Sequence, residues 1–119
     1  VAAWAGRDIE FGSHSRRHPD LTGVDDALLT SEIAGSKADL EQLLNAPVPA
    51  FAYPYGAYDK RVVAAAHGCY EHAFTCDEGL KGLAVDPALT RRSEVLPADS
   101  TLDLRLRLQL GWSPRRLRR

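Results

Sequence analysis

The sequence predicts an α/β fold in which parallel strands alternate with helices. Short apolar segments alternate with segments of helical periodicity, the connections between them are short, and polar motifs follow the ends of the predicted strands. The chain has 119 residues, of which 45% are hydrophobic and 26% are charged. This composition is typical of one globular domain, or of part of a larger one.

The first strand and helix are predicted in the N-terminal half of the chain. Residues 9–13 are apolar and β-tolerant, and polar residues follow them. Between residues 25 and 45, leucine and isoleucine recur at helical spacing, which predicts an amphipathic helix. Thr22 and Asp25 have the spacing of an N-terminal capping box, and Pro47 prevents the helix from continuing.

A second strand and helix follow, and then a third strand. Residues 50–53 form a short apolar run that leads into Pro54-Tyr55-Gly56. Asp59 is positioned to cap a helix whose end Gly68 would form in a left-handed conformation. Residues 69–75 then predict a strand. Ligand sites of parallel sheets lie at the carboxyl ends of their strands, where both unusual motifs of this sequence fall.

The C-terminal part gives weaker signals. Residues 92–96 are compatible with a further strand. Over residues 100–110 leucines alternate with other residues as in a strand, yet Ser100 and Asp103 could cap a helix, and we favour the helix. The two cysteines, Cys69 and Cys76, are expected to be buried free thiols.

Charge is distributed unevenly along the chain, although its net value is −1. Residues 1–104 carry an excess of acidic residues, whereas residues 105–119 contain arginines and no acid. The arginines are Arg105, Arg107, Arg115, Arg116, Arg118 and Arg119. A basic tail could contact nucleic acid or anionic lipid, but it lacks interleaved aromatic residues, so we expect a solvated end and no nucleic-acid partner. We also expect no membrane span, because charges interrupt every apolar run.

Two histidines four residues apart follow the first predicted strand. A turn that contains His14 and His18 can bring both imidazoles within reach of one ion. Such a pair taken alone is more often a surface or capping feature, because a metal site needs further ligands. Here Gly12 and Ser13 precede the pair and Pro19 follows it, which indicates a fixed turn at a strand end.

These residues resemble a known family. The segment from Phe11 to Thr22, with sequence FGSHSRRHPDLT, is similar to the second motif of the polysaccharide deacetylases, the NodB-homology domain of carbohydrate esterase family four. The segment from Phe51 to Asp59, FAYPYGAYD, resembles the third motif in its Phe-Ala-Tyr-Pro-Tyr-Gly variant. The resemblance covers nearly residues 3–110, so we expect a partial domain over residues 1–110 and a basic tail over residues 111–119.

The resemblance implies a distorted (β/α) barrel and a divalent metal, usually zinc, held by two histidines and one aspartate. His14 and His18 would be the histidine ligands, and the metal would activate water for attack on an N-acetyl group of a glycan. The backbone N–H of Tyr55 would stabilise the oxyanion. Tyr53, Pro54, Tyr55 and Gly56 would contact substrate. Tyr53 and Tyr58 could stack on a sugar, or they could pack as core.

Two parts of the family pattern have no match. The first motif, Thr-Phe-Asp-Asp-Gly, which supplies the aspartate base and the aspartate ligand, is absent. We expect it to be encoded upstream of Val1, because the true start of the chain has been removed or was never included. Asp25 and Asp26 are adjacent but better explained by helix capping. The late catalytic histidine is also unmatched, and His67 and His72 are interpreted as structural. We therefore expect a fragment of a deacetylase that is inactive alone, or else a non-catalytic carbohydrate-binding homologue.

Overall fold

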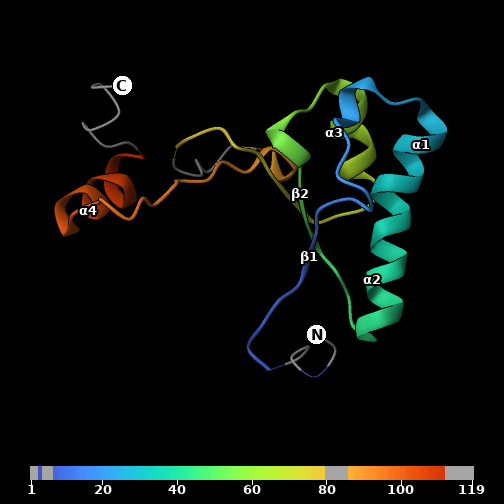
Figure 1. The fold of residues 1–119 in the computed structure, drawn as a ribbon, viewed down its shortest axis with the longest axis horizontal. Coiled ribbons are helices and arrows are strands. Elements are labelled where there is room, and N and C mark those ends of the chain that lie inside the picture. Colours follow the sequence, from blue (N-terminus) through green and yellow to red (C-terminus); the bar gives the residue numbers. More distant parts are fainter. Residues whose placement is uncertain (1–2, 4–6, 80–85, 112–119) are drawn as a thin grey trace.

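A computed structural model of the chain describes residue 3, residues 7–79 and residues 86–111. In this part of the chain, three short strands form one parallel sheet in the order β1-β2-β3. The strands are β1 (Gly12–Ser13), β2 (Ala50–Ala52) and β3 (His72–Phe74). Helices follow the first and second strands, as Figure 1 shows. The predicted α/β class with parallel strands and intervening helices is therefore confirmed.

The strands are shorter than the sequence predicts. Ile9 is 44% exposed and precedes the pairing, which begins at Gly12 opposite Ala50. The predicted strand over residues 92–96 is wrong, because these residues form no strand. The chain instead meets the sheet earlier, where Thr90 forms a parallel bridge with Phe74. The Thr90 N–H donates to the Ala73 carbonyl at 2.9 Å.

The helix predicted over residues 25–45 is confirmed as one helical run with a wider turn inside it. It consists of α1 (Asp26–Thr30), a π-helical segment (Ser31–Gly35) and α2 (Ser36–Leu44). The Asp25 side chain accepts the Leu28 N–H, and Asn45 ends the run in a left-handed conformation. The predicted capping box is wrong, since the Thr22 hydroxyl and N–H both donate to Asp20.

The second helix is α3 (Lys60–His67), and its predicted start is confirmed. The Asp59 side chain accepts the Val62 N–H at 2.9 Å, which satisfies one of the free donors of the first turn. Its predicted end is wrong: Gly68 keeps a right-handed conformation, with φ at −72°. No left-handed glycine is needed there, because the N–H groups of Gly68 and Tyr70 still bond to carbonyls of the last turn.

The helical interpretation of residues 100–110 is correct. They form α4 (Thr101–Leu110), which begins with a capping box between Ser100 and Asp103. Of the six arginines in residues 105–119, Arg105 and Arg107 lie in α4, and the four of the basic tail lie in residues 112–119, outside the described residues. Within the described ranges, no helix is long and apolar enough to cross a membrane.

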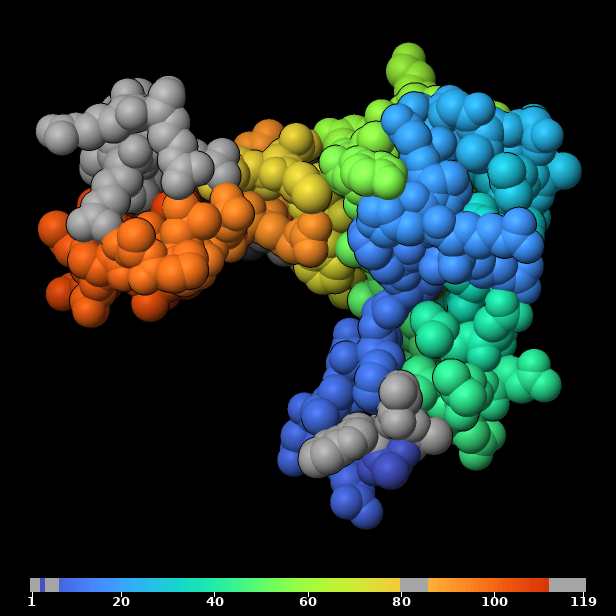
Figure 2. Space-filling view, in the orientation of Figure 1, coloured from blue at the N-terminus to red at the C-terminus, as the bar shows by residue number. Residues whose placement is uncertain are grey.

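The hydrophobic core lies between the sheet and the helices α1 to α3. Its buried members are Leu21, Leu29, Ile33, Leu44, Val48, Phe51, Tyr53, Val62, Ala66, Tyr70, Ala73 and Ala88. Phe51 on the central strand stacks on Tyr70 with ring centroids 5.0 Å apart. Cys69 and Cys76 are free, as expected, but neither is fully buried: Cys69 is partly exposed and Cys76 is exposed. No α4 residue belongs to this core, and in Figure 2 α4 forms an arm set off from the body.

Candidate functional site

The loop that follows β1 folds back on itself through two residues with positive φ. Ser15 has φ at 67° and His18 has φ at 58°, a region that non-glycine residues rarely occupy. The Ser15 hydroxyl oxygen accepts the His18 N–H at 2.9 Å and closes the turn. This turn, rather than a regular helix, brings the two histidine side chains together.

The imidazoles of His14 and His18 meet through their Nε2 atoms. These atoms are 3.0 Å apart, and the rings lie edge to face. On its other side, His14 Nδ1 lies 2.7 Å from the carbonyl oxygen of Ala52, at the end of β2. A carbonyl oxygen only accepts, so the neutral His14 ring carries its proton on Nδ1 and presents a lone pair at Nε2.

The loop after β2 places Tyr55 beside this pair. Pro54–Gly56 forms a 3-10 turn in which Tyr55 has φ at 58°. The Tyr55 ring packs edge to face on His18, with centroids 4.5 Å apart, and remains 70% exposed. The hydrogen bonds within the turn are donated by the N–H groups of Gly56 and Ala57. The Tyr55 N–H takes part in neither of them.

Two residues predicted to contact substrate have buried side chains, and for Tyr53 burial agrees with the alternative that it packs as core. Tyr53 is fully buried, its hydroxyl donates to the Ala88 carbonyl at 2.8 Å, and burial raises the pKa of its phenol. Pro54 is also buried. Tyr58 is half-buried, and its hydroxyl donates to Asp77 at 2.7 Å. Of the predicted substrate contacts, Tyr55 and the partly exposed Gly56 therefore face outward.

The distance between the two histidine side chains fits that between two ligands of one metal ion. Nitrogens bonded to a tetrahedral zinc at ~2.0–2.1 Å lie roughly 3.3 Å apart, close to the 3.0 Å between the two Nε2 atoms. A ligating histidine usually donates its other ring N–H to a carbonyl or carboxylate, as His14 does to Ala52. Within the described residues, however, no group of three or more histidine, cysteine, aspartate or glutamate side chains gathers.

The other aspartates and histidines that the sequence offered as site residues make contacts away from His14 and His18. Asp25 caps α1, and Asp26 accepts from the Arg61 guanidinium at 2.8 Å, so neither is placed with the histidines. His67 Nε2 lies 3.0 Å from Asp86. His72 is exposed on β3.

Sequence reasoning missed Glu32. Its carboxylate is buried and accepts the backbone N–H groups of Arg16 and Arg17, between the two histidines. A signal was present, because Glu32 follows Leu29 by three residues and so shares the buried side of the helical run.

Comparison with known proteins supports the resemblance. The family model described as polysaccharide deacetylase matches residues 1–71. The Streptococcus pyogenes deacetylase PplD, solved in complex with acetate, is 31% identical with a TM-score of 0.76, over 87% of this chain and 45% of that one. The chain belongs to the polysaccharide deacetylase family. A polysaccharide deacetylase of Bacillus cereus is 32% identical with a TM-score of 0.61, over 68% of this chain and 26% of that one.

The polysaccharide deacetylase family is typically metal-dependent. A de-N-acetylase of Aggregatibacter actinomycetemcomitans is only 10% identical but shares the fold, with a TM-score of 0.58 over 82% of this chain and 44% of that one. The chain thus spans less than half the length of these solved deacetylases. The fold is a partial match to their (β/α) barrels. No curated protein matches the chain.

Proposed function

We propose that the chain carries the histidine part of the active site of a metal-dependent enzyme that removes acetyl groups from an N-acetylated polysaccharide. The observation that carries the proposal is the convergence of His14 and His18, with their Nε2 atoms 3.0 Å apart and His14 oriented by the Ala52 carbonyl. We propose zinc as the metal, because imidazole nitrogens suit it.

Each residue of the site has a separate role in this proposal. A bound divalent ion would polarise the acetyl carbonyl and lower the pKa of a water molecule. His14 and His18 hold that ion through Nε2. The N–H of Tyr55 is the proposed donor to the oxyanion, because Pro54 has no N–H and Gly56 and Ala57 donate within the turn. The exposed ring of Tyr55 and the backbone of Gly56 would contact the sugar.

The proposal includes a third ligand and a general base from an aspartate pair on a further segment, with residues 1–110 forming a partial domain. A positioned base contributes roughly 10²–10⁴ in rate, so we expect residues 1–119 alone to release acetate very slowly. The basic tail over residues 111–119 takes no part in this chemistry.

Zinc titration by calorimetry tests the metal site directly. We expect the 119-residue chain, which supplies two of the three proposed ligands, to bind zinc weakly, and we expect His14→Ala and His18→Ala each to weaken binding by at least tenfold, because each removes one ligand. His72→Ala is the matched control, since His72 is also exposed but lies on β3. Equal zinc affinity in His14→Ala and the wild type would contradict the proposal.

The exposed Tyr55 ring also favours a second candidate, a carbohydrate-binding module without catalytic activity. Acetate release from N-acetylglucosamine oligomers separates the two candidates. Release that requires zinc and is lost in His14→Ala supports the deacetylase. Binding of the oligomers that is lost in Tyr55→Ala, without any release of acetate at saturating zinc, supports the binding module.

A further inference from the structure

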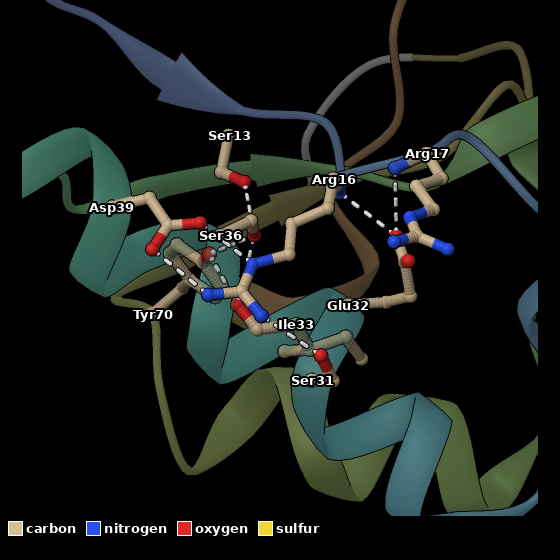
Figure 3. A network of polar contacts seen from close by, with 9 residues as sticks. All are labelled: Ser13, Arg16, Arg17, Ser31, Glu32, Ile33, Ser36, Asp39 and Tyr70. Carbon is tan, nitrogen blue, oxygen red and sulfur yellow. Dashed lines mark hydrogen bonds and ion pairs between the residues drawn. The ribbon is translucent and has the colours of Figure 1, made fainter.

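A buried carboxylate lies under the loop that carries the two histidines. Glu32, in the π-helical segment, is 1% exposed. Its Oε2 atom accepts the N–H of Arg16 at 2.8 Å and that of Arg17 at 2.9 Å, as Figure 3 shows. Both residues lie between His14 and His18 in the sequence. Burial of a carboxylate is tolerated only where hydrogen bonds or cations satisfy it, so Glu32 and the loop depend on each other.

We propose that Glu32 is a positioning residue of the metal centre, which fixes the backbone of the loop so that His14 and His18 can bind one cation. The inference rests on the proposed function, in which these histidines are metal ligands. Glu32 itself contacts backbone amides and touches neither imidazole in any hydrogen bond of the described residues. Its effect would therefore pass through the loop.

The conformation of the loop explains why it needs such a support. Ser15 and His18 both have positive φ, which is strained for residues other than glycine. Strained residues persist only where surrounding contacts determine their conformation. Without the two bonds to Glu32, the amides of Arg16 and Arg17 would turn to water and the loop could relax.

The side chain of Arg16 ties the same loop to the helical run a second time. Its guanidinium donates to both carboxylate oxygens of Asp39, at 2.6 and 2.8 Å, and to the Ser31 hydroxyl at 2.8 Å. It also lies directly over Gly35, where an added Cβ would be 2.6 Å from Arg16 Cζ. The absence of a side chain at Gly35 therefore lets the guanidinium approach.

A buried hydrogen-bond network holds the beginning of the loop. The hydroxyl groups of Ser13 and Ser36 are 2.7 Å apart. The carbonyl of Ile33 accepts from Ser36 at 3.0 Å and from the Tyr70 hydroxyl at 2.8 Å (Figure 3). Burial raises the pKa of Tyr70, so its phenol stays protonated and able to donate at neutral pH. The π-helical segment is thus bonded to the middle of the loop through Ser31 and Glu32, and Ser36, the first residue of α2, connects its Ile33 carbonyl to Ser13 at the start of the loop. Such segments often occur at functional sites.

The test compares Glu32→Ala with a matched control, Glu41→Ala. Each variant removes the side-chain acceptor, which glutamine would keep. Glu41 makes the same kind of bond, accepting the Val48 N–H at 3.0 Å, but in another loop. Amide hydrogen exchange and zinc calorimetry are measured on the 119-residue chain. We expect Glu32→Ala to speed exchange at Arg16 and Arg17 by at least tenfold, and to weaken zinc binding by about 10–100-fold, the usual effect of losing an outer support. Glu41→Ala should speed exchange at the Val48 amide and leave exchange at Arg16 and Arg17 and the zinc affinity unchanged.

Three results would overturn the inference. The first is unchanged protection of Arg16 and Arg17 in Glu32→Ala, and the second is lost protection with unchanged zinc affinity. The third is measured on the wild type and holds even where Glu32→Ala does not fold: exchange at Arg16 and Arg17 as fast as in an unprotected loop. Failure of the wild type to bind zinc, with these amides protected, would instead overturn the proposed function, and with it the metal role of Glu32.

Discussion

At the scale of single residues, the proton on each imidazole determines what the histidine pair can do. His14 is held with its proton on Nδ1 by the Ala52 carbonyl, so its Nε2 accepts, and the neutral His18 must donate through Nε2 across the 3.0 Å gap. A cation between the two nitrogens would replace that proton. His14 is therefore already in the tautomer that a ligand needs, whereas His18 has to change its own.

Gly56, in the Tyr55 loop, has no room for a side chain. It has φ at +67°, and a Cβ added there would be 2.6 Å from the Cβ of Cys76. We expect Gly56→Ala to lower the free energy of unfolding by about 1–3 kcal/mol, because it adds strain and a steric clash. Urea unfolding of the two proteins measures the difference.

Gly23→Ala is the control for this substitution. An added Cβ at Gly23 meets no atom within 4 Å, and the residue has no positive φ. Its effect should stay within about 0.5 kcal/mol, as for most surface changes. Equal losses in the two variants would show that the loop accommodates a side chain at Gly56.

At the scale of elements, the helical run over residues 26–44 shows what a sequence pattern can and cannot predict. Leucine and isoleucine spacing predicted its extent to within one residue, since apolar periodicity records which side is buried. The π-helical segment was not predicted, because its residues keep right-handed dihedrals and its wider turn has no distinct periodicity. Glu32 was missed for a related reason: its burial depends on contacts with a loop 15 and 16 residues away in the sequence.

Glu41 in α2 accepts a hydrogen bond from Val48 in the connection to β2. The stabilisation from this contact should decrease in acid. The Val48 N–H, and secondly Lys37, lower the pKa of this carboxyl below its usual value of about 4.3. A lowered pKa in the folded state stabilises the fold above the unfolded pKa, and this contribution is lost as pH falls through the folded value. The thermal midpoint of the wild type should therefore exceed that of Glu41→Gln at pH 7, and the difference should shrink towards pH 3.

Glu71→Gln, at an exposed glutamate, serves as the control and should follow the wild type throughout. A difference in thermal midpoint between wild type and Glu41→Gln that stays constant from pH 7 to pH 3 would mean that the charge of Glu41 does not stabilise the fold.

At the scale of the whole molecule, the sequence predicted the alternation of strands and helices and the convergence of the two motifs at one end of the sheet. The sequence overestimated the length of the strands, because apolar residues such as Ile9 precede the residues that pair with the neighbouring strand. It also could not assign Tyr53, whose buried hydroxyl bonds to Ala88, 35 residues later. Such partners depend on the packing of distant segments, which local patterns do not record.

The position of α4 leads to a prediction about the stability of the body, by which we mean the sheet, the helices α1 to α3 and the core between them, when α4 is removed. A compact chain of 119 residues has a radius of gyration of about 13.5 Å, whereas this chain has 16.0 Å, and α4 stands apart from the sheet in Figure 1. Leu102 and Leu108 of α4 are both more than 60% exposed, and Ala88 is the last core residue in the part of the chain that the structure describes. We therefore expect a chain ending at Pro97 to unfold at nearly the same temperature as the full chain, measured by calorimetry.

The matched control is a chain ending at Glu78, which lacks Ala88 and Thr90. It loses the acceptor of the Tyr53 hydroxyl and the segment that bonds to Ala73 and Thr75, so buried polar groups in the body lose their partners. This shorter chain should fail to unfold cooperatively. A chain ending at Pro97 that behaves the same way would show that α4 stabilises the body through the Arg107 and Glu78 pair, whose side chains approach to 3.5 Å.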